Sequence, residues 1–444
     1  MIVGVDYQPG GSSGFDPDSG VDPLSNGSVC LRDATLMQRL GVNTIRVYNL
    51  DPDLDHDQCA SIFNDAGIYM ILDVNSPLSG ESIDRTAPAE SYTLDYLTRI
   101  FKVVEAFAPY PNTLGFFAGN EVINEDSVSE VPNYMRAVTR DLKDYISNHV
   151  SREIGVGYSA ADVREVLADT FNYLSCELSN STSSKIDFFG LNSYSWCGNS
   201  TFTESGYDDL VEQFSNTTIP VFFSEYGCNL VTPREFSEVP VIYGTQMSVL
   251  SGGLVYEYSQ EPSNYGLVVL NDNDTVTLLT DYDNLQEQYN SLDVDQLTSA
   301  NSTATSLEAP TCDSSLITSG SFTTDFDVPS LPSGGADLIA SGVSDPNRGK
   351  LVDITDYTVE QMVYNSDGSE LTGLELTKLD SDESNVPGSN DSGSSSGSGS
   401  SASGTSTASG SSASATGSSG AAASVQFTGS TVALGAGLLG MLML

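Results

Sequence analysis

The chain has 444 residues, of which 60 are acidic and 16 are basic, so its formal net charge at pH 7 is −44. A charge of this sign repels phosphate backbones and anionic lipid headgroups, which argues against nucleic acid as a partner. The length permits one large hydrophobic core or two ordinary ones, and the composition changes along the chain.

Short apolar, β-branched or aromatic runs predict eight strands in the first part of the chain. They lie at residues 2–7, 44–48, 68–74, 114–118, 154–158, 186–191, 219–223 and 253–258. Segments with helical spacing lie between them, at residues 31–40, 59–65, 92–107 and 131–147. Strands that alternate with helices in this way predict an α/β fold, a (β/α)8 TIM barrel, as a catalytic domain over residues 1–312.

Three further regions are expected after the barrel. Residues 313–383 contain strand-like patches around the turn signal Asp367-Gly368 and predict a small β-rich extension. Residues 384–424 are mostly Ser, Gly, Ala and Thr, which predicts a disordered, O-glycosylated stalk because so little apolar surface cannot offset the ordering entropy. Residues 425–444 pass from a polar spacer into an apolar tail, the order of a GPI-attachment signal that is removed on maturation; a plain tail anchor is the alternative.

A GPI signal requires entry to the secretory pathway, and two other features fit that compartment. Six cysteines form an even number, although they permit fifteen pairings that sequence logic alone does not resolve. Seven Asn-x-Ser/Thr sequons begin at Asn26, Asn180, Asn199, Asn216, Asn273, Asn301 and Asn390. The first residues are typical of a core strand rather than a signal peptide, so we expect the N-terminus to be truncated.

Two of the predicted strands lead into a glutamate, Glu121 after residues 114–118 and Glu225 after residues 219–223. Either one alone is explained well by a structural ion pair, but a buried carboxylate is costly without a partner. Glycoside hydrolysis needs one carboxyl group to protonate the departing oxygen and another to attack the anomeric carbon or activate water. Catalytic groups of TIM barrels gather where the strands end, so we expect the two glutamates to face each other across a bound sugar.

Other polar residues at strand ends should converge on the same face. Arg46 is expected to hold Glu225 ionised, while a less favourable environment keeps Glu121 protonated. Asn120 can donate a hydrogen bond to the sugar 2-hydroxyl group, a contact that strengthens in the transition state.

Tyrosines at strand ends offer a flat apolar face with a polar tip, which suits sugar rings, although filling of the barrel is the alternative. The preferred tyrosines are Tyr48, Tyr194 and Tyr256. The remaining candidates at strand ends are Gln8, Asp73, Asn75 and Asn192.

No metal or cofactor is expected. The alternating Asp51, Asp53, Asp55 and Asp57 fail the calcium-loop pattern, since His56 stands where the loop needs Gly. Two histidines are too few for a zinc cluster. The glycine-rich segment at residues 9–14 lacks the Gly-Lys-Ser/Thr of a phosphate loop.

Several long strings, in one order, make the chain resemble the fungal GPI-anchored β-1,3-glucanosyltransferases of glycoside hydrolase family 72, in the subgroup without the Cys-rich carbohydrate-binding module. These strings are Val5-Asp6-Tyr7-Gln8 and residues 43–48, 114–121, 188–197, 219–228, 231–234 and 251–258. The resemblance implies Glu121 as acid/base, Glu225 as nucleophile and transfer from a β-1,3-glucan donor to a glucan acceptor without a cofactor. A hydrolytic β-1,3-glucanase and an inactive wall-binding glycoprotein are the alternatives.

The resemblance also implies further contacts and pairings. The implied donor contacts are Gln8, Tyr48, Asp73, Asn75, Asn120, Tyr194 and Tyr256. On the acceptor side it implies Asp162, with Arg164 as a substitute for the family's arginine, which is Leu167 here. The implied disulfides are Cys30 with Cys59, Cys176 with Cys312 and Cys197 with Cys228. The implied location is the cell surface, on the outer face of the plasma membrane through the GPI anchor and in the cell wall.

Overall fold

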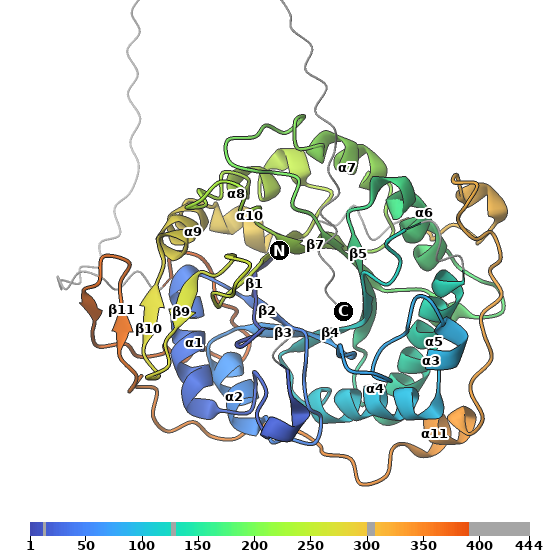
Figure 1. Ribbon diagram of the computed structural model, residues 1–444, viewed down its shortest axis with the longest axis horizontal. Coiled ribbons are helices and arrows are strands. Elements are labelled where there is room, and N and C mark those ends of the chain that lie inside the picture. Colours follow the sequence, from blue (N-terminus) through green and yellow to red (C-terminus); the bar gives the residue numbers. More distant parts are fainter. Residues whose placement is uncertain (12–14, 126–129, 300–306, 390–444) are drawn as a thin grey trace, which may run out of the picture. The chain divides into compact units, whose positions relative to one another are not determined.

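The computed structural model describes residues 1–11, 15–125, 130–299 and 307–389, and in them eight parallel strands close into a barrel. The strands follow one another in chain order around the ring, and helices surround them (Figure 1). They are β1 (Ile2–Asp6), β2 (Thr44–Val47), β3 (Tyr69–Asp73), β4 (Thr113–Asn120), β5 (Gly155–Ala161), β6 (Phe188–Asn192), β7 (Val221–Tyr226) and β8 (Gly252–Val255). The ring closes where Val5 of β1 pairs with Val255 of β8. The predicted (β/α)8 TIM barrel is confirmed.

The strand ends differ from the predicted boundaries in places that matter for the site. β4 continues to Asn120 and β7 to Tyr226, so Glu225 lies inside a strand rather than after one. Every residue of β2 and of β7 is buried, because side chains on one side fill the barrel and those on the other meet the helices. Ladder hydrogen bonds therefore fix the backbone at Arg46 and Glu225.

The helices cover the outside of the barrel and include the segments with predicted helical spacing, except that residues 92 and 93 precede the helix that begins at Leu94. The longer ones are α1 (Gly27–Leu40), α2 (Asp57–Asp65), α4 (Leu94–Phe107), α5 (Val131–His149), α6 (Arg164–Ser175), α7 (Tyr207–Phe214) and α9 (Thr280–Asn290). The shorter ones are α3 (Pro88–Ser91), α8 (Val239–Ile242), α10 (Val294–Thr298) and α11 (Gly335–Ser341). Within the described residues, no helix combines the length and the apolar character needed to span a membrane.

The first helix shows how local sequence sets its ends. The Asn26 side chain caps α1 by accepting a hydrogen bond from the Val29 amide. Gly41 ends the helix with φ +81°, a left-handed conformation that glycine adopts without penalty. A Cβ atom at Gly41 would also lie 2.3 Å from the backbone of Pro387, so the close approach of the C-terminal segment requires glycine there.

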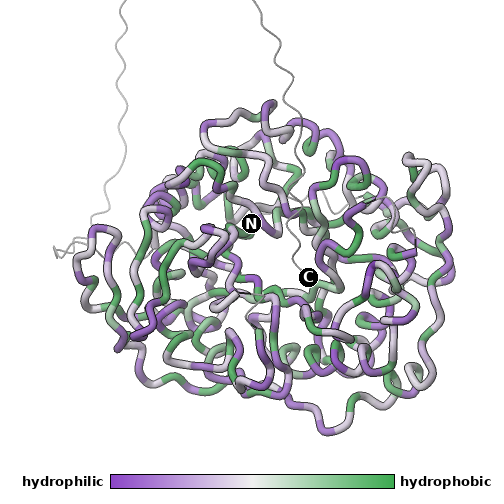
Figure 2. Tube along the Cα trace, viewed as in Figure 1, coloured by the Kyte–Doolittle hydropathy of each residue, from purple (hydrophilic) through white to green (hydrophobic). Residues whose placement is uncertain are grey.

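The hydrophobic core has two parts. A large cluster joins the outward faces of the strands to the inward faces of the helices. A small cluster of Ile71, Phe117, Phe222 and Leu254 comes from four different strands and fills the barrel interior. Figure 2 shows the corresponding pattern, with hydrophobic and hydrophilic residues alternating along the outer helices. The barrel below the site is therefore packed with side chains.

The segment after the barrel runs along the outside of the ring (Figure 1). A second sheet has the order β12-β11-β10-β9, from β9 (Val268–Leu270), β10 (Val276–Leu278), β11 (Val363–Tyr364) and β12 (Glu370–Leu371). The turn signal at Asp367-Gly368 lies between β11 and β12, where Gly368 has φ +83°. Asn385 is fully buried and donates to the carbonyl groups of Gln38 and Val42, which attaches this segment to α1.

These contacts bear on the extent of the folded part. Met1–Asp391 form one compact unit, which contains both the barrel and residues 313–383. Residues 390–424 of the predicted stalk and the whole predicted GPI signal at 425–444 lie outside the described residues.

Three disulfides connect separate parts of the fold. Cys30–Cys59 joins α1 to α2, and Cys197–Cys228 joins the segments that follow β6 and β7. Cys176–Cys312 ties the end of α6 to the start of the C-terminal segment. These are the pairings implied by the family resemblance, and all three are confirmed.

Candidate active site

Glu225 lies on β7 with both carboxylate oxygens bound by donors. Oε1 accepts hydrogen bonds from Arg46 Nη1 at 3.2 Å and from the Tyr48 hydroxyl group at 2.9 Å. Oε2 accepts from the Tyr194 hydroxyl group at 2.7 Å. The donors come from β2, from the residue that follows it and from the segment after β6, so this arrangement exists only because the barrel is closed.

Arg46 is fully buried and is itself held on several sides. Its Nε and Nη2 atoms donate to the two carboxylate oxygens of Asp73 on β3, at 3.0 and 2.9 Å. Its guanidinium carbon lies 4.3 Å from the centre of the Tyr48 ring and 4.7 Å from that of Phe117. The bidentate ion pair fixes the direction of the remaining Nη1 donor toward Glu225. Both carboxylate oxygens of Asp73 thus accept hydrogen bonds from Arg46.

Two opposing effects act on the pKa of Glu225. Burial, the larger effect, raises it, and the nearby Glu121 raises it further. Arg46 and the hydroxyl groups of Tyr194 and Tyr48 lower it, because each stabilises the charged form. The net result is a pKa of about 7. Arg46 therefore favours the ionised form of Glu225, as expected, but it lowers the pKa by less than burial raises it.

Glu121 occupies a different environment just beyond the end of β4. It is half-buried, and its φ of +52° is uncommon for a residue with a side chain. A hydrogen bond from its amide to the Ser159 carbonyl oxygen, 2.8 Å, holds this conformation in place. Backbone strain of this kind concentrates at functional sites, and here it turns the side chain out of the strand direction.

Asn192 connects the surroundings of the two glutamates. Its Nδ2 atom donates to Glu121 Oε1 at 2.7 Å and to Asn120 Oδ1 at 3.1 Å. Its Oδ1 atom accepts from the hydroxyl groups of Ser159 and Ser224, and Ser224 directly precedes Glu225. Asn192 also pairs with Glu225 across β6 and β7. A single amide thus sets the relative placement of Glu121 and Glu225.

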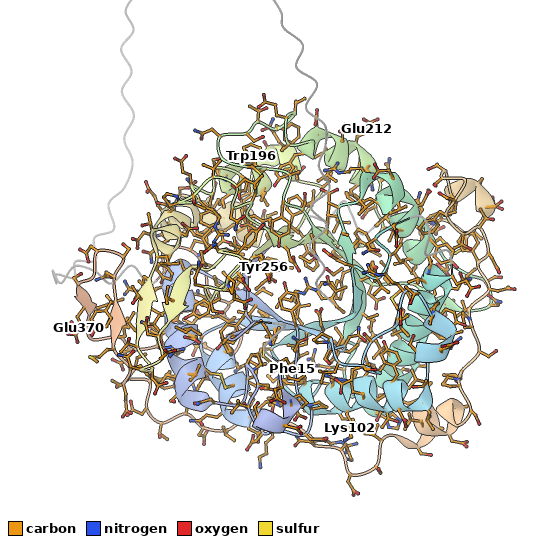
Figure 3. All side chains as sticks on the ribbon, viewed as in Figure 1. Phe15, Lys102, Trp196, Glu212, Tyr256 and Glu370 are labelled. Carbon is orange, nitrogen blue, oxygen red and sulfur yellow. A yellow bond between two sulfur atoms is a disulfide. The ribbon has the colours of Figure 1, made fainter. Side chains whose placement is uncertain are left out.

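Tyrosine rings gather beside Glu225. The Tyr256 ring meets the rings of Tyr48 and Tyr194 edge to face, with centroids 6.4 and 6.2 Å apart. Tyr265 contacts both Tyr194 and Tyr256, at 5.5 and 5.3 Å. Figure 3 places Tyr256 near the centre of the view along the barrel. Such a cluster offers apolar ring faces together with hydroxyl groups, which is the combination that sugar rings need.

Two further predicted residues support the site from its edge. Gln8 Oε1 accepts hydrogen bonds from the amides of Tyr48 and Asn49, at 3.2 and 3.0 Å, and so fixes the backbone after β2. Asn75 donates to the Ala118 carbonyl oxygen and accepts from the Tyr96 hydroxyl group, so it links β3, β4 and α4. Both polar contacts of Asn75 are thus within the protein.

Asp162 and Arg164 lie together beside a hollow of about 610 Å³ that they line with Ser195, Gly206 and neighbouring residues. Arg164 pairs with Asp162 and donates to the Gly206 carbonyl oxygen. The Ser193 hydroxyl group donates to Asp162 Oδ2 at 2.7 Å, and the Ser193 amide donates to the Glu225 carbonyl oxygen at 2.9 Å. Ser193 thus connects this hollow to the strand that carries Glu225.

Sequence reasoning missed several members of the site. Tyr265 lies in the loop between β8 and β9 and not at a strand end. A search for polar residues at strand ends therefore does not find it. Ser159 and Ser224 lie within β5 and β7, where only the closed barrel directs their hydroxyl groups to Asn192. Among the described residues, no group of His, Cys, Asp and Glu side chains is arranged to hold a metal ion.

A TIM barrel with a glutamate just after β4, a second one in β7 and tyrosines beside the second glutamate has the arrangement of a two-carboxylate glycoside-processing enzyme. The family model described as Glucanosyltransferase, of glycoside hydrolase family 72, matches residues 1–293. The chain belongs to this family.

Curated relatives and solved structures agree with this assignment. The chain is 59% identical over 391 residues to the 1,3-beta-glucanosyltransferase gel2 of Aspergillus fumigatus, which covers 88% of this chain and 82% of gel2. It is 50% identical over 373 residues to the probable 1,3-beta-glucanosyltransferase GAS3 of Saccharomyces cerevisiae, covering 81% of this chain and 70% of GAS3.

The solved structure of a mutant Saccharomyces cerevisiae Gas2p, in complex with laminaritetraose and laminaripentaose, is similar in fold. It has a TM-score of 0.65 and 38% sequence identity, and the match covers 75% of this chain and 70% of that chain. The recognition of the family from the sequence strings is confirmed.

Proposed function

We propose that this protein is a 1,3-β-glucanosyltransferase that cleaves a β-1,3-glucan internally and joins the new reducing end to the non-reducing end of another β-1,3-glucan. The observation that carries the proposal is Glu225, with both oxygens fixed by donors and Glu121 linked to its strand through Asn192. Support also comes from the glucanosyltransferase relatives and from the laminari-oligosaccharides bound to Gas2p.

In the first half of the reaction, Glu225 attacks the anomeric carbon and Glu121 protonates the departing glycosidic oxygen. The bond to the leaving glucan breaks, and a covalent glucosyl-enzyme ester forms on Glu225. Arg46, Tyr48 and Tyr194 orient the Glu225 carboxylate for this attack. Asn120, whose side chain meets Asn192, is placed to donate to the sugar 2-hydroxyl group.

In the second half, Glu121 acts as the base. It takes the proton from the 3-hydroxyl group of an acceptor glucan, whose oxygen attacks the anomeric carbon while Glu225 leaves as a carboxylate. Glu121 thereby regains its proton, and no cofactor or metal is needed. A retaining outcome follows from the two displacements.

We assign the remaining site residues by their contacts. The tyrosines Tyr48, Tyr194 and Tyr256 bind donor sugar rings, and Gln8 and Asn75 shape the donor side through the backbone contacts described above. Asp73 acts through Arg46. Asp162, which Arg164 orients, serves the acceptor side in the hollow next to Ser193.

For the location we propose the cell surface, with a GPI anchor on the outer face of the plasma membrane and the cell wall as a second destination. The support is the order of residues 425–444, a polar spacer followed by an apolar tail, and the stalk-like composition of residues 384–424.

The test is incubation of the secreted protein with a reduced laminari-oligosaccharide and chromatography of the products. Products longer than the donor support the proposal. Products that are only shorter indicate a hydrolytic β-1,3-glucanase, and an unchanged donor indicates a wall-binding glycoprotein without activity. Glu225→Gln serves as the inactive control on the same donor.

A further inference from the structure

Asp6 is the last residue of β1 and is completely buried beside the site. Within the described part of the protein, neither of its carboxylate oxygens has a hydrogen-bond partner. Two other buried aspartates nearby are fully satisfied. Asp33 accepts from the Tyr7 and Tyr258 hydroxyl groups and from Arg32, and Asp73 accepts twice from Arg46. Asp6 is therefore not a structural carboxylate of the usual kind.

An unpartnered, ionised carboxylate is far more costly to bury than a neutral one, so the environment favours the protonated form of Asp6. Burial and the charges of Glu225 and Glu257 raise the pKa of Asp6 well above its ordinary value, against smaller lowerings by Arg46 and by the nearby Tyr48 hydroxyl group, whose hydrogen bond goes to Glu225 Oε1. Arg46 pairs with Asp6 in register across β1 and β2, but its side chain donates to Asp73, Glu225 and the Ser224 carbonyl oxygen.

The groups that act on Asp6 come from every neighbouring element. Arg46 and Tyr48 come from β2 and the residue after it, and Glu225 comes from β7. Glu257 and Tyr256 follow β8, and Tyr194 follows β6. Among these, Glu225 and Glu257 are the other carboxyl groups, and burial raises the pKa of Glu257 to about 8. The surroundings thus contain more acid groups than Arg46 can neutralise.

We infer that Asp6 is a positioning residue: its carboxyl group, enclosed without a partner beside Arg46 and Glu225, keeps a proton so that Glu225 carries the negative charge. The inference rests on the proposed function, in which Glu225 is the nucleophile. No proton moves to or from Asp6 during the reaction, since the proton that is transferred belongs to Glu121.

The neutral state of Asp6 matters most in the second displacement. When the acceptor oxygen bonds to the anomeric carbon, the ester bond to Glu225 breaks and the electron pair returns to the Glu225 carboxylate. A negative charge on Asp6 would oppose the appearance of this second negative charge, so ionised Asp6 slows the step. Glu121 acts as the base in this step, so a higher pH does not remove the group that accepts the proton.

The first experiment measures protonation directly, by infrared spectroscopy of the wild-type protein and of Asp6→Asn at pH 8. The carbonyl band of protonated carboxylic acids should be weaker in Asp6→Asn than in the wild type by the component from Asp6, while the component from Glu257, whose pKa is about 8, should remain. The matched control is Asp33→Asn, at an equally buried but fully hydrogen-bonded aspartate, which should lose no such band. An identical band in wild type and Asp6→Asn overturns the inference. Labelling of the wild type with ¹³C-aspartate gives the same answer if Asp6→Asn does not fold.

The second experiment measures the decay of the glycosyl-enzyme. A laminaribiosyl fluoride donor loads the enzyme, and intact-mass spectrometry follows loss of the adduct at a fixed acceptor concentration after a jump to higher pH. The wild-type rate should fall at least tenfold along an alkaline limb that is absent in Asp6→Asn. Equal profiles overturn the positioning role. Failure of the wild type to form any adduct contradicts the proposed nucleophile instead, while the infrared band still reports on Asp6.

Discussion

Tyr194 and Glu225 are joined by a 2.7 Å hydrogen bond from the tyrosine hydroxyl group to Oε2 of the glutamate. Tyr194 lies in the segment after β6, and Glu225 lies in β7. The other oxygen of Glu225 is occupied by Arg46 and Tyr48. Tyr194 therefore donates to one of the two oxygens that share the negative charge of the Glu225 carboxylate. Its hydroxyl group provides a direct way to change the proton affinity of Glu225.

Replacing Tyr194 by Phe should raise the pKa of Glu225 and move the acidic limb of kcat/KM to higher pH. The hydroxyl group stabilises the charged form, so its loss favours protonation and leaves less active enzyme at low pH. Loss of a hydrogen bond to a charged group should move the acidic limb by about one pH unit. The measurement is the pH profile of transfer to a laminari-oligosaccharide. Tyr364→Phe, at a tyrosine of β11, is the matched control, and equal shifts in both variants would refute the role.

Glu121→Gln and Glu225→Gln should both abolish most of the transfer, but in different ways. Glu121→Gln removes the proton donor and should lower the rate by about 10²–10⁴-fold on a glucan. The rate of the first displacement should fall far less on a donor whose leaving group needs no proton, such as a glycosyl fluoride, and release of fluoride in the first turnover measures it. Glu225→Gln removes the nucleophile and should be inactive on both. Rate measurements with the two donors separate the roles, and equal behaviour of the two variants would contradict them.

Arg46→Met should destabilise the fold by about 3–5 kcal/mol, because it leaves Asp73 and Glu225 buried without their cation. The double variant Arg46→Met with Asp73→Asn should recover part of this loss, since it removes one of the stranded charges. Denaturant titration of the three proteins gives the values. A double variant less stable than Arg46→Met would show that Asp73 contributes through contacts other than the ion pair.

Two disulfides should affect stability and catalysis differently. Exchanging Cys176 and Cys312 for Ser removes a disulfide with a sequence separation of 136 residues, and the free energy of unfolding should fall by about 5 kcal/mol. The turnover of the folded protein should stay unchanged. The Cys197–Cys228 disulfide has a sequence separation of 31 residues, and its loss should lower the free energy of unfolding by about 3–4 kcal/mol. It follows Tyr194 and Glu225 by three residues each, so its loss should also lower kcat. Melting curves and steady-state kinetics provide the comparison.

The fold should be most stable at mildly acidic pH. Burial raises the pKa of Glu238 from 4.5 to about 7. The folded state therefore holds this proton more tightly than the unfolded state, and the stabilisation is complete below pH 4.5 and is lost as the pH rises to about 7. The change from this group is on the order of 3 kcal/mol. Denaturant titration from pH 4.5 to 8 should show a falling free energy of unfolding. Glu238→Gln should flatten the fall, whereas the exposed Glu235→Gln should not.

Much of the fold was predictable because it depends on local patterns. Apolar runs such as residues 219–223 identify buried strands, and their alternation with helical segments is sufficient to predict the barrel. The C-terminal segment was harder, because its attachment depends on isolated side chains. Asn385 reaches the carbonyl groups of α1 and Val42 from more than 340 positions away in the chain, and no periodicity marks such a contact.

The eight-stranded barrel, the two glutamates and the family could be predicted from residue order, because periodicity and motif strings are properties of neighbouring residues. The surroundings of each carboxyl group became known only from the three-dimensional arrangement of the strands. This arrangement brought Arg46, Tyr48 and Tyr194 onto Glu225, joined Glu121 to Asn192, and enclosed Asp6 without a partner. The physical reason is that desolvation and hydrogen bonding depend on distances between strands that are far apart in the chain.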